Sequence, residues 1–349
     1  MSTMLAGRLH LDTRKFVVEE IPVPVPGPGE VLVEVKAAGV CLSDLHLIDG
    51  SISSPHPAPS GVLTLGHEIS GVIHGLGTGL RRGLTVGTRV ALQAGQSCDQ
   101  CAGCARRGPC TDFRGRGVAY DGGWAQYTLA REDTVVPIPD ELPFDQAAII
   151  PDAVSTSYAA LTATVQVRAA QAVGIWGVGG LGVHAVRIAR MVGAAPVIAV
   201  DPLPGARERA LAFGADLALD PATPGFAEAM LQATGGRGLN YAFDFAGVPV
   251  VREQASSALG DHGALVLVGL TSAPLTISES LTFSVMNKQV LGHYGAEFEH
   301  VYELVRLVGC GRLDLAPSIT AHIPLAEATE AIHRLQHKVG NPIRLILVP

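Results

Sequence analysis

The stretch VGIWGVGGLG, residues 173–182, constrains the fold of this chain more than any other feature of its sequence. A short apolar run ends at Gly177, and Gly177, Gly179 and Gly182 fit the pattern G-x-G-x-x-G ahead of a helix-like segment. This order predicts a buried strand, a tight turn and a helix, because glycine adopts backbone conformations that other residues avoid. Asp201 closes the next apolar run, PVIAVD.

A glycine pattern in this context is typical of a dinucleotide site, where the backbone approaches a pyrophosphate at a helix N-terminus. An acid after the second strand accepts hydrogen bonds from the adenosine ribose. The alternative is that the glycines only turn the chain and that the acid only ends a strand. The complete order favours a dinucleotide, and the residues expected to contact it are Gly177, Val178, Gly179, Gly180, Leu181, Gly182 and Asp201.

The pattern of apolar and polar residues along the chain changes near residue 153. Before it, GEVLVEVKAAGV alternates apolar and polar residues, and other short apolar runs are bounded by glycine, which predicts an irregular, barrel-like β domain. After it, apolar runs alternate with helix-like segments, which predicts a doubly wound parallel sheet of the α/β class. We expect residues 1–153 and 297–349 to form one domain and residues 154–296 the other.

Composition excludes several classes of protein. Six cysteines in 349 residues are too few for a small disulfide-stapled secreted domain, and the start of the chain has no secretion signal, so we expect a cytoplasmic protein. The formal net charge of −7 and the absence of a basic stripe argue against nucleic acid. Glycines interrupt the most membrane-like stretch, 169–186. A small-molecule partner is therefore expected.

Two groups of residues resemble metal sites. CDQCAGCARRGPC places Cys98, Cys101, Cys104 and Cys110 within thirteen positions, which leaves a zinc site, an iron–sulfur cluster and free thiols open, although ferredoxin runs continue with three residues and Cys-Pro and this loop does not. GVCLSDLH and LGHE are weaker by themselves, since a single cysteine or histidine is more often structural.

The order of the motifs is more specific. GVCLSDLH, GHE, the cysteine loop, DGGWAQY, PDAVSTSY, GVGGLG and FDFAG together resemble the zinc-dependent medium-chain alcohol dehydrogenase family over essentially the whole chain. The resemblance implies a GroES-like β-barrel catalytic domain, a Rossmann domain, and a catalytic zinc held by Cys41, His67 and Asp152. It also implies a structural zinc on the four-cysteine loop, although five residues separate Cys104 from Cys110 where relatives have seven.

The resemblance further assigns roles around the catalytic zinc. Ser43 would take the proton of the alcohol and pass it through the nicotinamide ribose to His46 and solvent, and Asp44 would orient the histidine ligand. Glu68 lies beside the metal in relatives, without an assigned role. Asp152 also stands where a helix N-cap could be, an alternative that can coexist with metal binding.

Further dinucleotide contacts follow from the same resemblance. The positions concerned are Thr156 at the nicotinamide, Val268, Gly269 and Leu270 at its carboxamide, and Arg344 at the pyrophosphate. Asp201 predicts NAD rather than NADP, because an acid repels the 2′-phosphate, although Arg207 could reach the adenosine edge.

We therefore expect an NAD-dependent zinc alcohol dehydrogenase that forms a homodimer or homotetramer. Ala94 stands where many relatives carry an aromatic residue beside the substrate, which suggests secondary, cyclic or aromatic alcohols. The alternatives are a reductase of iminium or conjugated double bonds on the same fold, and a non-catalytic dinucleotide-binding protein. Cys310 is expected to be an ordinary buried thiol.

Overall fold

A computed structural model describes residues 2–106, 108 and 110–349 of the chain, which divides into two compact units. The first unit comprises Met1–Ala153 and Phe298–Pro349, and the second comprises Val154–Glu297. Among the described residues, no helix combines the length and the apolar character that crossing a membrane requires.

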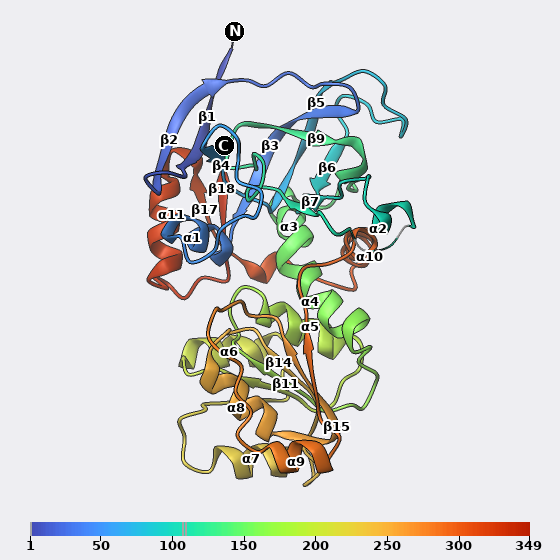
Figure 1. Cartoon of the computed structure of the whole chain (residues 1–349), viewed down its shortest axis with the longest axis vertical. Coiled ribbons are helices and arrows are strands. Elements are labelled where there is room, and N and C mark those ends of the chain that lie inside the picture. The colour runs from blue at the N-terminus through green and yellow to red at the C-terminus, as the bar shows by residue number, and fades with distance from the viewer. Residues whose placement is uncertain (1, 107, 109) are drawn as a thin grey trace. The chain divides into compact units, whose positions relative to one another are not determined.

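The first unit is built mainly of antiparallel strands (Figure 1). Its largest sheet has the order β10-β6-β5-β3-β18-β17, with β9 also paired to β3, and two smaller sheets have the orders β2-β1-β4 and β7-β8. The strands are β1 (Thr3–His10), β2 (Lys15–Pro22), β3 (Glu30–Val40), β4 (Val62–Thr64), β5 (Ile69–Leu76), β6 (Arg89–Leu92), β7 (Gly95–Gln96), β8 (Arg114–Gly115), β9 (Tyr127–Arg131), β10 (Val135–Pro137), β17 (Ile319–Pro324) and β18 (Arg344–Val348).

Short helices connect these strands. They are α1 (Leu42–Asp49), α2 (Ala102–Ala105), α3 (Phe144–Ile149), α10 (Phe298–Gly309) and α11 (Ala328–Gln336), with the 3₁₀ turns η1 (Glu132–Thr134), η4 (Ala316–Ser318) and η5 (Leu325–Glu327). A π-helical turn, η2 (Ile150–Val154), follows α3. The last strand, β18, pairs antiparallel with the carboxyl end of β3, so the red end of the chain lies beside a blue strand in Figure 1.

The second unit contains one parallel six-stranded sheet of order β13-β12-β11-β14-β15-β16. Its strands are β11 (Val173–Trp176), β12 (Val197–Val200), β13 (Leu217–Leu219), β14 (Leu239–Asp244), β15 (Leu259–Leu267) and β16 (Gln289–Gly292). The helical elements are α4 (Ser155–Ala159), the π-helical η3 (Ala160–Thr164), α5 (Gly182–Met191), α6 (Pro204–Ala212), α7 (Phe226–Ala233), α8 (Pro249–Ser257) and α9 (Ser280–Val285).

The strand order reverses direction at β11, which is the arrangement of a doubly wound sheet. Every residue of β11 and β12 is buried, as expected for parallel strands that are covered on both faces. In such a sheet ligands bind outside the carboxyl ends of the strands where the order reverses, and the glycine turn after β11 lies at that end. The predicted fold class is confirmed.

Candidate active site and cofactor sites

Four side chains of the first unit converge on one point. The potential ligand atoms of Cys41, His67, Glu68 and Asp152 all lie within 4.8 Å of one another. The Oδ2 atom of Asp152 lies 3.3 Å from Nε2 of His67 and 3.6 Å from Sγ of Cys41. The structure therefore brings together the three residues that the sequence predicted as ligands of a catalytic metal.

These residues reach the site from different elements. Cys41 stands between β3 and α1, His67 lies in the loop between β4 and β5, and Asp152 lies in η2. The loop before His67 needs glycine at position 66, where φ is +95° and a Cβ atom would lie 2.2 Å from Cδ1 of Trp124. Helical residues run without interruption from α3 into η2, so Asp152 lies inside a helical stretch and the N-cap interpretation is wrong.

The spacing of the ligand atoms fits zinc. For bonds of about 2.0 to 2.3 Å in a tetrahedron, neighbouring ligand atoms lie about 3.3 to 3.8 Å apart. The two distances from Asp152, 3.3 Å to His67 and 3.6 Å to Cys41, are of this size. One thiolate, one imidazole and one carboxylate also form a typical catalytic zinc set, which leaves a fourth position for substrate.

The ring of His67 lies between two carboxylates. Nε2 faces Asp152, while Nδ1 lies 3.4 Å from Oδ1 of Asp44, whose other oxygen accepts a hydrogen bond from the backbone N–H of Cys41 at 2.9 Å. Burial disfavours the charged ring, but Asp44 and the hydrogen bond with Asp152 outweigh burial and hold the pKa of His67 well above its usual value. Asp44 thus occupies the position predicted for an orienting carboxylate.

Glu68 has a partner that the sequence did not indicate. Its Oε1 atom lies 3.3 Å from a terminal guanidinium nitrogen of Arg344, and both side chains are almost fully buried. Burial raises the pKa of the Glu68 carboxyl to about 8, although the charge of Arg344 opposes this rise. Arg344 also donates to the carbonyl of Val40 at 3.3 Å, and its predicted contact with a pyrophosphate stays a prediction.

Ser43 and His46 both lie on α1. The Ser43 hydroxyl oxygen is 3.8 Å from Sγ of Cys41, so it lies beside a metal ligand. His46 follows three residues later and is half-buried, and residues three apart share one face of a helix. Their arrangement fits the predicted proton relay, which stays a prediction.

The second group of potential metal ligands is the cysteine loop. The Sγ atoms of Cys98, Cys101, Cys104 and Cys110 all lie within 4.8 Å of one another, with pairs at 3.5, 3.6 and 3.9 Å. Tetrahedral zinc with bonds of about 2.3 Å requires sulfur atoms about 3.8 Å apart. The shorter spacing before Cys110 therefore still brings the four sulfur atoms together.

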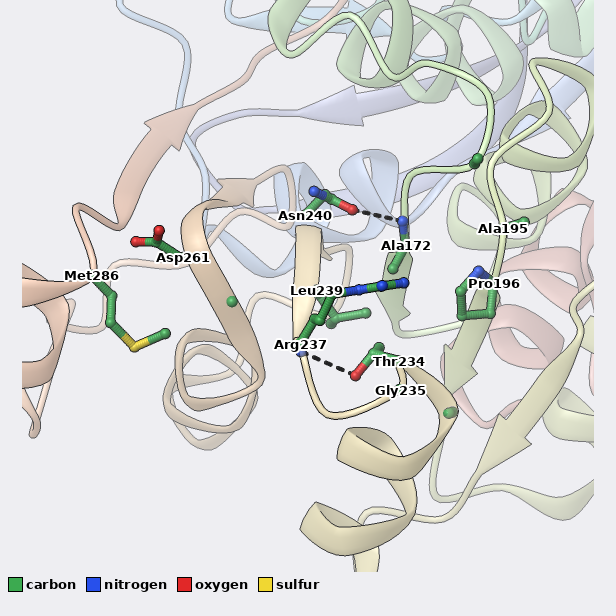
Figure 2. Close-up of a pocket in the computed structure, with 14 residues that line it drawn as sticks. Ala172, Ala195, Pro196, Thr234, Gly235, Arg237, Leu239, Asn240, Asp261 and Met286 are labelled. Atoms are coloured by element: carbon green, nitrogen blue, oxygen red, sulfur yellow. Dashed lines mark hydrogen bonds between the residues drawn. The ribbon is translucent and has the colours of Figure 1, made fainter.

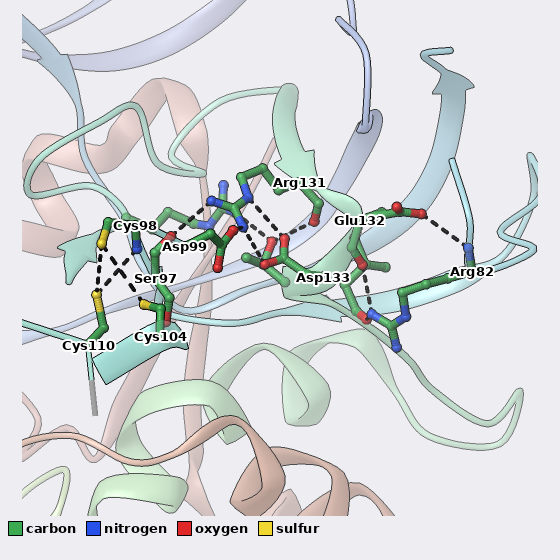
Figure 3. A network of polar contacts seen from close by, with 12 residues as sticks. Arg82, Ser97, Cys98, Asp99, Cys104, Cys110, Arg131, Glu132 and Asp133 are labelled. Atoms are coloured by element: carbon green, nitrogen blue, oxygen red, sulfur yellow. Dashed lines mark hydrogen bonds and ion pairs between the residues drawn. The ribbon is translucent and has the colours of Figure 1, made fainter. Parts of the chain in front are cut away.

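A polar network holds the base of this loop (Figure 3). Arg131, at the end of β9, donates to the carbonyl of Ser97 at 2.9 Å and pairs with the carboxylates of Asp99 and Asp133. Within the loop, hydrogen bonds from Thr111 and from the N–H of Cys104 lower the pKa of the Cys101 thiol to about 5. Arg131 was missed at the sequence level, because a single arginine outside a motif gives no signal.

The glycine turn of the second unit has the geometry of a phosphate cradle. Gly177 has φ of +85°, and a Cβ atom on Gly182 would lie 1.9 Å from the carbonyl oxygen of Gly177, whereas the corresponding position on Gly179 is open. Asp201 accepts hydrogen bonds from the N–H groups of Val178 at 2.8 Å and Leu203 at 2.9 Å. The turn thus presents open backbone beside the predicted ribose acceptor.

Arg207 bonds to nearby main-chain and carboxylate oxygens. It donates to the carbonyls of Asp201 and Pro202, both at 2.8 Å, and pairs with Asp220 at 3.2 Å. Its predicted contact with the adenosine stays a prediction.

A histidine that the sequence did not indicate, His293, contacts Thr156, which was predicted to lie at the nicotinamide. Nε2 of His293 lies 3.0 Å from the carbonyl of Thr156, and its Nδ1 lies 2.8 Å from the Thr164 hydroxyl. The backbone N–H of His293 donates to Leu267, immediately before the strip 268–270, at 2.9 Å. These contacts connect the helical residues 155–164 with the carboxyl edge of the sheet.

A pocket of about 490 Å³ in the second unit lies at the other edge of the sheet (Figure 2). Its lining includes Ala172, Pro196 and Leu239, which stand at or just before the starts of β11, β12 and β14. The glycine turn follows the end of β11, so this pocket is not the predicted dinucleotide site.

Comparison with known proteins decides the family. Residues 27–140 match the alcohol dehydrogenase GroES-like domain, and residues 180–309 match the zinc-binding dehydrogenase domain. A probable zinc-binding alcohol dehydrogenase of Mycobacterium tuberculosis is 32% identical, over 99% of this chain and 87% of the relative. The chain belongs to the zinc-dependent medium-chain alcohol dehydrogenase family.

Solved structures agree with this membership. A putative zinc-binding dehydrogenase from Sinorhizobium meliloti, bound to NADP, superposes with a TM-score of 0.91 at 27% identity, over 100% of both chains. Acetophenone reductase from Geotrichum candidum, in complex with NAD, superposes with a TM-score of 0.87 at 28% identity, over 100% of this chain and 98% of that chain.

For this alcohol dehydrogenase, the predicted family, oxidoreductase class and cofactors, zinc and a nicotinamide dinucleotide, are confirmed. The prediction that Cys310 is a buried thiol was wrong, because Cys310 is exposed. It follows the last residue of α10, a helix whose buried residues are Val301, Leu304 and Val305.

Proposed function

We propose that this chain interconverts secondary, cyclic or aromatic alcohols with the corresponding carbonyl compounds, with NAD as the hydride carrier. The observation that supports this most directly is that the ligand atoms of Cys41, His67 and Asp152 lie within 4.8 Å of one another, with both distances from Asp152 at tetrahedral spacing and Ser43 beside them. A purely structural or dinucleotide-binding protein has no need of a three-donor site with an adjacent hydroxyl.

Each residue then has a distinct task. When bound, zinc supplies a Lewis acid that makes an alcohol hydroxyl more acidic, and NAD supplies the hydride acceptor. Cys41, His67 and Asp152 would hold the metal, and Asp44 would keep Nε2 of His67 directed at it. Ser43 would accept the hydroxyl proton as it gives up its own to the relay, and His46 would release a proton to solvent at the end of that relay.

The cysteine loop would hold a second zinc with a structural role. Four thiolates fill all the positions of a tetrahedral zinc, so no position is left for substrate. Arg131 ties the start of the loop to the strand β9 through Ser97 and Asp99. This arrangement supports a total of two zinc ions per chain.

The proposed substrate class depends on Ala94, which lies just before β7 and is partly buried. A methyl group there in place of an aromatic ring leaves room for a bulky substituent on the carbinol carbon. Replacing Ala94 with Trp should lower kcat/KM for 1-phenylethanol more than for 2-propanol. An equal effect on both alcohols would argue against a pocket next to residue 94.

The activity itself is tested on zinc-loaded protein with a panel of alcohols and ketones, following NADH by absorbance. Cys41→Ser should abolish alcohol oxidation while NADH binding survives, because the proposed metal and dinucleotide sites use different segments. The exposed Cys310 offers the matched control, and Cys310→Ser should keep full activity. Undiminished oxidation in Cys41→Ser would refute the proposed metal site.

A further inference from the structure

A buried ion pair lies where β14 ends. Asp244 is the last residue of β14 and is fully buried, and its Oδ2 atom accepts a hydrogen bond from Nε of Arg252, on α8, at 3.0 Å. Its Oδ1 atom accepts from the backbone N–H groups of Ala246 at 2.9 Å and Gly247 at 2.8 Å. One carboxylate therefore organises the whole turn after β14.

The same two residues also hold the strip 268–270. The backbone oxygen of Asp244 accepts from the N–H groups of Val268 at 2.9 Å and Gly269 at 2.7 Å. A terminal nitrogen of Arg252 donates to the carbonyl oxygen of Gly269 at 3.3 Å. Gly269 is thus fixed at both its N–H and its carbonyl, so the direction of the next peptide group is fixed as well.

The backbones of the turn and the strip are in direct contact. A Cβ atom on Gly269 would lie 2.3 Å from the nitrogen of Gly247, and one on Gly247 would lie 2.8 Å from the carbonyl oxygen of Leu270. Leu270 itself is half exposed, at 48%. The strip is therefore packed on one side and open on the other, at the carboxyl edge of the sheet, where a dinucleotide binds in doubly wound folds.

We propose that Arg252 is a positioning residue that orients the backbone strip 268–270 for the nicotinamide ring. This inference rests on the proposed function, which places the nicotinamide carboxamide at that strip. A buried guanidinium needs full pairing, and its planar fork can bond Asp244 and Gly269 at once, which the single ammonium of lysine cannot reproduce. Arg252 acts through the backbone, without contacting the cofactor.

The test compares two ligands that differ only in the nicotinamide end. ADP-ribose shares the adenosine, the pyrophosphate and the second ribose with NADH but lacks the ring. Titration calorimetry on zinc-loaded protein should show that Arg252→Met weakens the binding of NADH by about tenfold or more. The same variant should change the affinity for ADP-ribose by less than about twofold. Arg252→Lys should give an intermediate loss for NADH, and it serves as the second variant if Arg252→Met does not fold.

A matched control comes from the same unit. Arg190 pairs with Asp216 at 3.0 Å on the surface, and Arg190→Met should leave both affinities unchanged. Equal losses for NADH and ADP-ribose in the Arg252 variants would show a purely structural role and overturn the inference, as would unchanged NADH binding. Wild-type protein that bound neither ligand would instead refute the proposed function, and this inference with it.

Discussion

Replacing Asp152 with Ala tests whether Asp152 is a metal ligand or a carboxylate with only a structural role. Asp152 lies inside a helical stretch, with Oδ2 at 3.3 Å from His67 and 3.6 Å from Cys41, and its side chain is 21% exposed. We expect Asp152→Ala to lose zinc from this cluster while the zinc on the cysteine loop remains. The protein should therefore contain one zinc per chain instead of two and should not oxidise alcohols.

The size of the expected loss of zinc affinity follows from the proposed direct contact between the Asp152 carboxylate and the metal. Removing an outer partner of a metal ligand typically weakens metal binding by about 10- to 100-fold, so removing a ligand should cost at least about 100-fold. At about 1.4 kcal/mol per factor of ten, this is at least about 2.8 kcal/mol of zinc binding free energy. A carboxylate with only a structural role would contribute nothing to zinc affinity.

The assay is competition for zinc against a chelator of known affinity, followed by elemental analysis. Asp145 is a matched control, since it lies in the preceding helix α3, pairs with His322 at 2.9 Å, and has a side chain that is 24% exposed. Asp145→Ala should keep both zinc ions. If Asp152→Ala retained two zinc ions with unchanged affinity, the assignment of Asp152 as a ligand would be refuted.

Four further predictions concern the relay, the thiols, the affinity for zinc and the cofactor. Ser43→Ala should lower kcat by roughly a hundredfold at constant zinc content, and a near-normal rate would exclude it from proton transfer. In zinc-stripped protein at pH 6 to 7, iodoacetamide should alkylate Cys101 first and Cys104 last among the four cysteines of the loop. The reason is that the pKa of Cys101 is lowered to about 5 and that of Cys104 is raised to about 12. Peptide mapping that showed the reverse order would contradict these shifts. Since the pKa of His67 is raised in the metal-free protein, zinc must displace a proton there, and zinc affinity measured by chelator competition should fall as the pH falls. Wild-type protein should prefer NAD by at least about tenfold in kcat/KM, about 1.4 kcal/mol, and Asp201→Gly should narrow this preference; equal use of NADP by the wild type would show that Asp201 does not select the cofactor.

The sequence by itself determined the features that depend on neighbours in the chain. The glycine turn and its acid are recognisable because a strand, a turn and a helix follow one another within thirty residues, and each has its own local signal. The four cysteines of the loop are close in sequence, so their meeting at one point needed little beyond a short turn. The order of motifs then indicated the family, and with it Cys41 and His67.

Only the tertiary structure decided which distant side chains meet. Arg344 reaches Glu68 because β18 pairs antiparallel with β3, with Leu345 opposite Val40, and this register is a property of the sheet rather than of either segment. Arg252 likewise contacts Asp244 and the strip 268–270 because its helix, α8, follows β14 in the chain and packs against both β14 and β15. Such contacts depend on which strands and helices pair, and the residues that make them follow no local pattern, because sequence periodicity predicts an element and its buried face but not its partner.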